Sequence, residues 1–131
     1  MAESRSRPLS PHLTVWRWGP GMVVSILHRI TGAGLTIVGL AVLVWWLTAI
    51  AGGTDAYANF TKAASSPIGL VVLIGLTWAF FQHLLSGIRH LVMDTGAAFE
   101  LGVNKGFAIL TIVGSVLLTA LMWFYLLGVR R

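Results

Sequence analysis

Three long uncharged apolar runs constrain this chain more than any other feature of its sequence. They span Gly32–Ala51, Ile68–Ile88 and Gly106–Val129. Each supplies about the 20 residues that a helix, rising about 1.5 Å per residue, needs to cross roughly 30 Å of hydrocarbon. Only 10% of the residues are charged, which is too few to cover a water-exposed surface. We therefore predict an all-α membrane protein of three transmembrane helices.

Helix-breaking residues set the expected boundaries within a single membrane-anchor domain of residues 1–131. Gly19-Pro20-Gly21 closes a polar arm, residues 1–21, in which a short surface helix is predicted at Pro11–Trp18. The arm lacks the layout of a cleavable signal peptide, so the spans should belong to the mature chain. A short loop should join the first two spans. The transmembrane helices are predicted at 22–52, 66–94 and 104–129.

The distribution of basic residues predicts the orientation. The two ends of a three-span chain lie on opposite faces, and loops rich in Lys and Arg stay in the cytoplasm. Six basic residues against three favour a cytoplasmic N-terminus. They are dispersed beside the spans, which favours contact with membrane lipid and not with nucleic acid. The six are Arg5, Arg7, Arg17, Arg29, Arg89 and Lys105, and the three are Lys62, Arg130 and Arg131.

What the sequence lacks narrows the function further. The absence of cysteine excludes disulfides, thiolate-bound iron–sulfur clusters and a cysteine nucleophile from this chain. No nucleotide-binding or metal-hydrolase motif is present. The outer half of the membrane region has too few polar residues to line a transport path, which counts against a channel or carrier. Any redox cofactor held here must use histidine or non-covalent contacts.

Most polar residues of the membrane region gather at one end. The first two helices are antiparallel, so the end of the second returns to the leaflet in which the first begins. In the predicted orientation this is the cytoplasmic leaflet, and a functional site is expected there. The residues are Ser25, His28 and Arg29 on the first helix, and Gln82, His83, Arg89, His90 and Asp94 on the second.

His83 is the most informative of these residues. It lies about ten residues, or roughly 15 Å, inside the end of the second helix, and ionisable groups at such depth are usually functional. His83, His90 and Asp94 share one helix face, and Gly87 leaves that face open to a neighbouring helix or a flat macrocycle. Two interpretations remain open, namely an axial haem or metal ligand and a packing histidine bonded to a neighbouring carbonyl.

Ser25, His28 and Arg29 share a face of the first helix within about one turn. An arginine at this depth can simply extend to lipid headgroups. Beside a serine, and facing the end of the second helix, it could instead bind a quinone carbonyl or a propionate, because both need a fixed donor in a partly dry setting.

Three strings are more specific than the single residues. They are Arg7-Pro-Leu-Ser-Pro-His-Leu13 in the arm, Ser25-Ile-Leu-His-Arg-Ile-Thr-Gly32 in the first helix, and His83-Leu-Leu-Ser-Gly-Ile-Arg-His-Leu-Val-Met-Asp94 in the second. In this order and with three spans, they resemble the large cytochrome b membrane-anchor subunit of succinate dehydrogenase, respiratory complex II. The resemblance covers essentially the whole chain.

The resemblance implies one haem b shared with a second small membrane-anchor subunit, which would supply the other axial ligand. The complex would lie in the bacterial inner membrane or, in a eukaryote, in the mitochondrial inner membrane. Electrons would arrive from a docked iron–sulfur subunit and reduce ubiquinone. Succinate would be oxidised on a flavoprotein subunit, since nothing in this chain could perform that step. The implied roles are axial haem ligand for His83, quinone binding for Ser25, Arg29 and Asp94, and contact with the haem propionates or the haem surroundings for His28, Arg29, His90 and Gly87.

Three other interpretations stay open. The chain could be a haemless structural anchor of a related complex, with His83 as a packing residue and no redox difference band. It could be a small carrier or channel subunit that co-purifies with no redox subunit. Finally, His28 and His83 could clamp the haem within this chain, which would then retain haem without its partner anchor.

Overall fold

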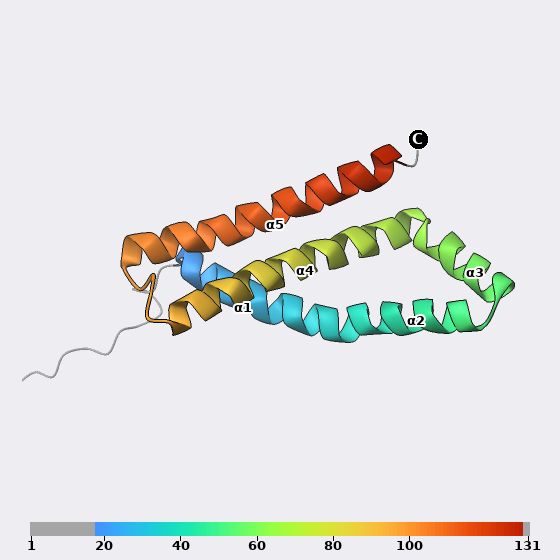
Figure 1. The fold of residues 1–131 in the computed structure, drawn as a ribbon, viewed down its shortest axis with the longest axis horizontal. Helices are drawn as coiled ribbons and strands as arrows, with labels where there is room; N and C mark the ends of the chain where they lie inside the picture. The colour runs from blue at the N-terminus through green and yellow to red at the C-terminus, as the bar shows by residue number, and fades with distance from the viewer. Residues whose placement is uncertain (1–17, 130–131) are drawn as a thin grey trace, which may run out of the picture.

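The structure is a computed structural model that describes residues 18–129 (Figure 1). The first span is continuous and consists of α1 (Pro20–Gly34), a π-helical segment η1 (Leu35–Gly39) and α2 (Leu40–Ala51). α4 (Pro67–Asp94) and α5 (Leu101–Val129) are the other two long helices. All three are long and apolar enough to cross a membrane, which confirms the predicted all-α, three-span fold. The surface helix predicted at Pro11–Trp18 lies outside the described residues, except for Trp18.

α4 packs against both the first span and α5. In Figure 1 it runs between α2 and α5, and α1 crosses it near the start of α5. α1 and α5 begin, and α4 ends, at the same end of the bundle, which we call the site end (Figure 1). α1 also contacts α5. The opposite end, which we call the far end, carries the connection from α2 to α4. This arrangement brings the start of the first span and the end of α4 together, as their antiparallel order requires.

Local signals explain where these helices begin and turn. Pro20 starts α1 after an extended residue, and its fixed φ suits the first helical position. The Ser66 hydroxyl caps α4 by accepting a hydrogen bond from the Gly69 N–H at 3.1 Å, and Pro67 follows it. Gly53 and Gly96 adopt positive φ values of 88° and 87° at the two connections, a conformation that costs glycine little.

The connection at the far end differs from the sequence prediction. Instead of a short loop, the structure has an 11-residue helix, α3 (Thr54–Ala64). Asp55 in its first turn and Lys62 in its last turn complement the helix dipole. Phe60 packs edge-on against Trp45 of α2, with ring centroids 5.0 Å apart. The charges that suggest a loop therefore stabilise a short helix that packs on the first span.

Buried side chains in the bundle are mostly small or polar, whereas the large apolar ones face outward. Ile68 is 79% exposed and Phe124 is 81% exposed. In lipid there is no hydrophobic force between helices, so small and hydrogen-bonding residues mediate their contacts. The pattern therefore supports a hydrocarbon environment for the outer surface. The buried polar residues are Thr31, Gln82, Ser86, Arg89, Thr111, Ser115 and Thr119.

Candidate functional site

Three histidines from two helices meet in the half of the bundle nearer the site end. The rings of His28 on α1 and His83 on α4 stack with centroids 4.0 Å apart and planes 3° from parallel. The His90 ring lies 5.3 Å from that of His28 and is tilted by 55°. His28 and His83 are half-buried, and His90 is exposed. The histidine face of α4 therefore meets α1.

The hydrogen bond of His83 fixes which ring nitrogen is free. Its Nδ1 lies 3.1 Å from the backbone carbonyl oxygen of His28. A carbonyl oxygen can only accept, so Nδ1 is the donor in this bond, and in the neutral ring Nε2 then keeps its lone pair. Histidines that ligate metals typically donate their other N–H to such a carbonyl, which orients the ring and raises its basicity. The donor set at His83 therefore fits an iron-ligating imidazole.

Glycines line both sides of the histidine stack. A Cβ added to Gly32 would lie 2.8 Å from Cε1 and 3.2 Å from Nδ1 of His83, so a larger residue would not fit here unless the ring moved. A Cβ added to Gly87 would lie 3.9 Å from Cε1 of His28, an ordinary contact. The sequence interpretation singles out Gly87 and misses Gly32. The available signal is that Gly32 lies four residues after His28, on the same helix face.

The His28 imidazole keeps an unused polar atom. Its Nδ1 is buried and has no hydrogen-bond partner in the described part of the chain. Buried polar groups are nearly always paired, so such an atom indicates a group that can still bind a ligand or a partner chain. The stack is face to face, and neither ring presents its edge to an iron shared with the other. This arrangement counts against a haem clamped between His28 and His83.

Ser25, Arg29 and Asp94 lie around the site without joining the histidine stack. Ser25 is half-buried on α1, one turn before His28, whereas Arg29 and Asp94 are exposed. Within residues 18–129, their side chains form no hydrogen bond or ion pair that would link them to each other or to His90. Their donor and acceptor groups therefore remain free for a ligand.

A buried polar contact behind the histidines is missing from the sequence interpretation. Gln82, Ser86 and Ser115 are all 0% exposed. The Gln82 Nε2 donates to Ser86 Oγ at 3.0 Å, and the Ser115 hydroxyl of α5 donates to Gln82 Oε1 at 2.8 Å. Gln82 and Ser86 are four residues apart on α4, and Thr111, Ser115 and Thr119 repeat every four residues on α5. These spacings are the signal that could have revealed a polar seam between the helices.

Arg89 is also buried. In the sequence interpretation it is one of the six basic residues that predict the orientation of the chain in the membrane. It lies inside α4, is only 4% exposed, and donates from Nη2 to Oδ1 of Asn104 on α5 at 2.6 Å. Its Nε has no hydrogen-bond partner in the described residues. Gly21 of α1 lies against the same guanidinium, since an added Cβ would be 3.9 Å from Nη2. Arg89 therefore joins all three spans at the site end.

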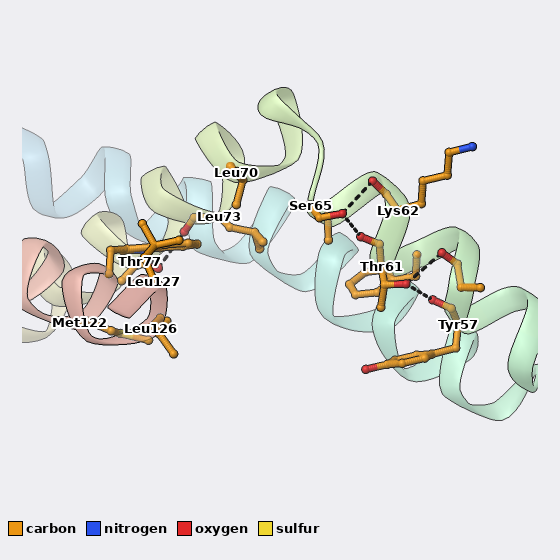
Figure 2. Close-up of a pocket in the computed structure, with 14 residues that line it drawn as sticks. Tyr57, Thr61, Lys62, Ser65, Leu70, Leu73, Thr77, Met122, Leu126 and Leu127 are labelled. Carbon is orange, nitrogen blue, oxygen red and sulfur yellow. Dashed lines mark hydrogen bonds between the residues drawn. The ribbon is translucent and has the colours of Figure 1, made fainter. Parts of the chain in front are cut away.

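A groove of about 710 Å³ lies far from these residues, between α3, the start of α4 and the end of α5 (Figure 2). The Thr61 and Ser65 hydroxyls on its wall donate to backbone carbonyls of α3. Figure 2 shows the Lys62 ammonium directed away from the groove. Tyr57 and Lys62 are its titratable lining residues. The histidine cluster at the other end therefore remains the stronger candidate site.

The chain matches one protein family over most of its length. The family described as succinate dehydrogenase/fumarate reductase transmembrane subunit matches residues 3–122. The succinate dehydrogenase cytochrome b556 subunit of Paracoccus denitrificans is 39% identical over 116 residues, covering 88% of each chain. The subunit of the same name from Rickettsia conorii is 39% identical over 117 residues, covering 89% of this chain and 90% of its own.

A mitochondrial protein matches as well. The succinate dehydrogenase cytochrome b560 subunit of Sus scrofa is 32% identical over 126 residues, which cover 88% of this chain and 72% of the relative. The family match includes α1, α4 and most of α5, and thus every residue of the histidine cluster. The chain therefore belongs to the succinate dehydrogenase/fumarate reductase transmembrane subunit family.

Proposed function

We propose that this chain is the cytochrome b membrane anchor of a succinate:ubiquinone oxidoreductase. In this proposal it holds haem b through His83, together with a second small anchor subunit, and forms part of the quinone-reduction site. The observation that carries the proposal is the 3.1 Å contact between His83 Nδ1 and the His28 carbonyl, which leaves Nε2 free to bind iron. Its relatives are named cytochrome b556 and b560 subunits, which are names of haem proteins.

The residues around His83 would hold the haem in place. Gly32 and the His28 carbonyl restrain the His83 ring from the α1 side. His28, with its unpaired Nδ1, and the nearby His90 and Arg29 are the polar groups of this chain that would bind the propionates. When bound, haem b supplies a one-electron carrier inside the membrane.

The quinone site would be formed by Ser25, Arg29 and Asp94. The Ser25 hydroxyl and the Arg29 guanidinium would donate hydrogen bonds to a quinone carbonyl oxygen. These bonds strengthen as that oxygen gains negative charge, so they favour reduction. Asp94, at the end of α4, would hold a proton for delivery to the reduced ring. The N-terminus and the site end would face the cytoplasm, where the iron–sulfur and flavoprotein subunits would dock.

Arg29→Gln and Ser25→Ala test the quinone site in the purified complex. We expect succinate-dependent reduction of ubiquinone to fall about 10- to 100-fold, because each variant removes a donor to the developing negative charge. Succinate oxidation with a soluble dye that takes electrons from the other subunits should stay at the wild-type rate. Lys105→Gln removes an exposed cation from the same end and is the matched control.

The two assays separate the possible outcomes. Loss of ubiquinone reduction with normal dye reduction supports the placement of the site on this chain. Wild-type kcat and KM for ubiquinone in both variants would contradict it, and so would equal losses in the Lys105→Gln control.

A further inference from the structure

We propose that Gln82 is a positioning residue for His83. Its buried hydrogen bond with Ser115 of α5 sets the rotation of α4, and thereby the orientation of the imidazole that the next residue carries. A second bond, to Ser86 on α4 itself, holds the Gln82 amide in place for that contact. The inference rests on the proposed role of His83 as a haem ligand. It adds Gln82 and Ser115, residues to which the proposed function assigns no contact with the haem or the quinone.

The first support is the burial of the contact. All three side chains have no exposed surface, and the bonds measure 3.0 Å from Gln82 Nε2 to Ser86 Oγ and 2.8 Å from Ser115 Oγ to Gln82 Oε1. In hydrocarbon no water can replace a lost partner, so a buried amide holds the bonds it has. The amide therefore fixes one rotational setting of α4 against α5.

The second support is how α5 holds its other buried hydroxyls. Thr111 donates to the Ala108 carbonyl at 2.8 Å, and Thr119 donates to the Ser115 carbonyl at 2.7 Å. Both bonds stay within α5 and cannot set the position of a neighbouring helix. The Ser115 hydroxyl has two acceptors, the Ile112 carbonyl of its own helix and Oε1 of Gln82, each at 2.8 Å. It differs from the two threonines because the second of these acceptors lies across the helix interface. Among the buried hydroxyls of α5, that of Ser115 therefore makes the contact that can hold α4 at the position next to His83.

The third support is the direct link from Gln82 to His83. Neighbouring residues on an α-helix point about 100° apart, so Gln82 faces α5 while His83 faces α1. Leu85 packs closely against Gly114 of α5, because a Cβ added to Gly114 would lie 3.1 Å from Cδ1 of Leu85. On the other side, Gly32 is in contact with the His83 ring. With α4 confined between two close surfaces, a change in its rotation moves the imidazole directly.

The test uses the assembled complex and the ferric haem as its reporter. Low-temperature EPR g-values respond to the orientation of the axial imidazole planes, and a redox titration gives the midpoint potential. Gln82→Leu removes the amide at similar size, and Ser115→Ala removes its partner. Ser115→Thr keeps the hydroxyl, and Thr119→Val removes a buried hydroxyl that bonds only within α5.

We expect Gln82→Leu and Ser115→Ala to keep a b-type band but to shift the g-values and the midpoint potential in the same direction. Ser115→Thr and Thr119→Val should match the wild type. If Gln82→Leu fails to assemble, the comparison of Ser115→Ala with Thr119→Val decides. Wild-type g-values and potential in Ser115→Ala would overturn the positioning role alone. A wild-type complex with no b-type band would overturn the proposed function itself, and this inference with it.

Discussion

Gly32→Val is expected to abolish the b-type band of the purified complex. Even a single added carbon would lie 2.8 Å from Cε1 of His83, and valine adds two methyl groups beyond it. The imidazole must then move away from α1. That movement breaks its 3.1 Å contact with the His28 carbonyl and turns Nε2 away from its ligating position. Gly32→Ala should give an intermediate result, with the band retained but shifted.

Helix propensity does not explain such a loss. Replacing glycine by alanine inside a helix stabilises the helix by roughly 0.5–1 kcal/mol, so the helix itself should tolerate Gly32→Ala. Gly34→Val is the control, because nothing lies within 4 Å of a Cβ at that position. Reduced-minus-oxidised spectra of the three complexes measure the effect. An unchanged band in Gly32→Val would refute the close packing of His83 on α1.

Asn104→Leu is expected to destabilise the complex more than Arg89→Leu does. The asparagine variant leaves the Arg89 guanidinium, 4% exposed, without the bond that Oδ1 accepts at 2.6 Å. Removing the partner of a buried charge lowers the free energy of unfolding by about 3 kcal/mol or more. Replacing the charged group as well lowers it much less, because no unpaired charge is left in the interior. The double variant should therefore be more stable than Asn104→Leu alone.

Thermal melting of the purified complexes measures this order. Asn59→Leu, on the exposed surface of α3 at the far end, is the matched control and should melt with the wild type. If Arg89→Leu lowers the melting temperature as much as Asn104→Leu, or if the double variant is the least stable, then the bond from Arg89 to Asn104 does not hold the site end together.

The sequence was sufficient to predict the membrane-spanning fold and the meeting of the two helix ends. Apolar runs of about 20 residues have one physical solution in a bilayer, and antiparallel order places His28 near His90. The histidine face of α4 follows from its seven-residue spacing. These features depend only on helix geometry, which is the same in every chain.

The remaining features depend on how helices rotate and approach one another. A pattern shows that Gln82 and Ser86 share a face, but not that this face meets Ser115 of an apolar-looking third span. Likewise, Gly32 becomes important only because the His83 ring lies against it. The sequence alone does not reveal which side chain packs against this glycine.

The other difference is the helix α3, which the structure has in place of the predicted short loop. Residues 54–64 follow directly after the Gly52-Gly53 pair and contain Asp55 and Lys62, so the local pattern resembles a loop. The contact between Phe60 and Trp45 of α2 favours the helical state of α3, and this contact joins elements that a local pattern treats separately.

The reduced-minus-oxidised absorption spectrum of the purified complex, wild type beside His83→Ala, tests the central proposal most directly. We expect a b-type band in the wild type that is lost or markedly shifted in His83→Ala, while His90→Ala, which removes an exposed imidazole from the same face, keeps a band. An unchanged band in His83→Ala would show that the haem is ligated elsewhere. A wild-type complex without any band would identify the chain as a haemless anchor and contradict the proposed ligation.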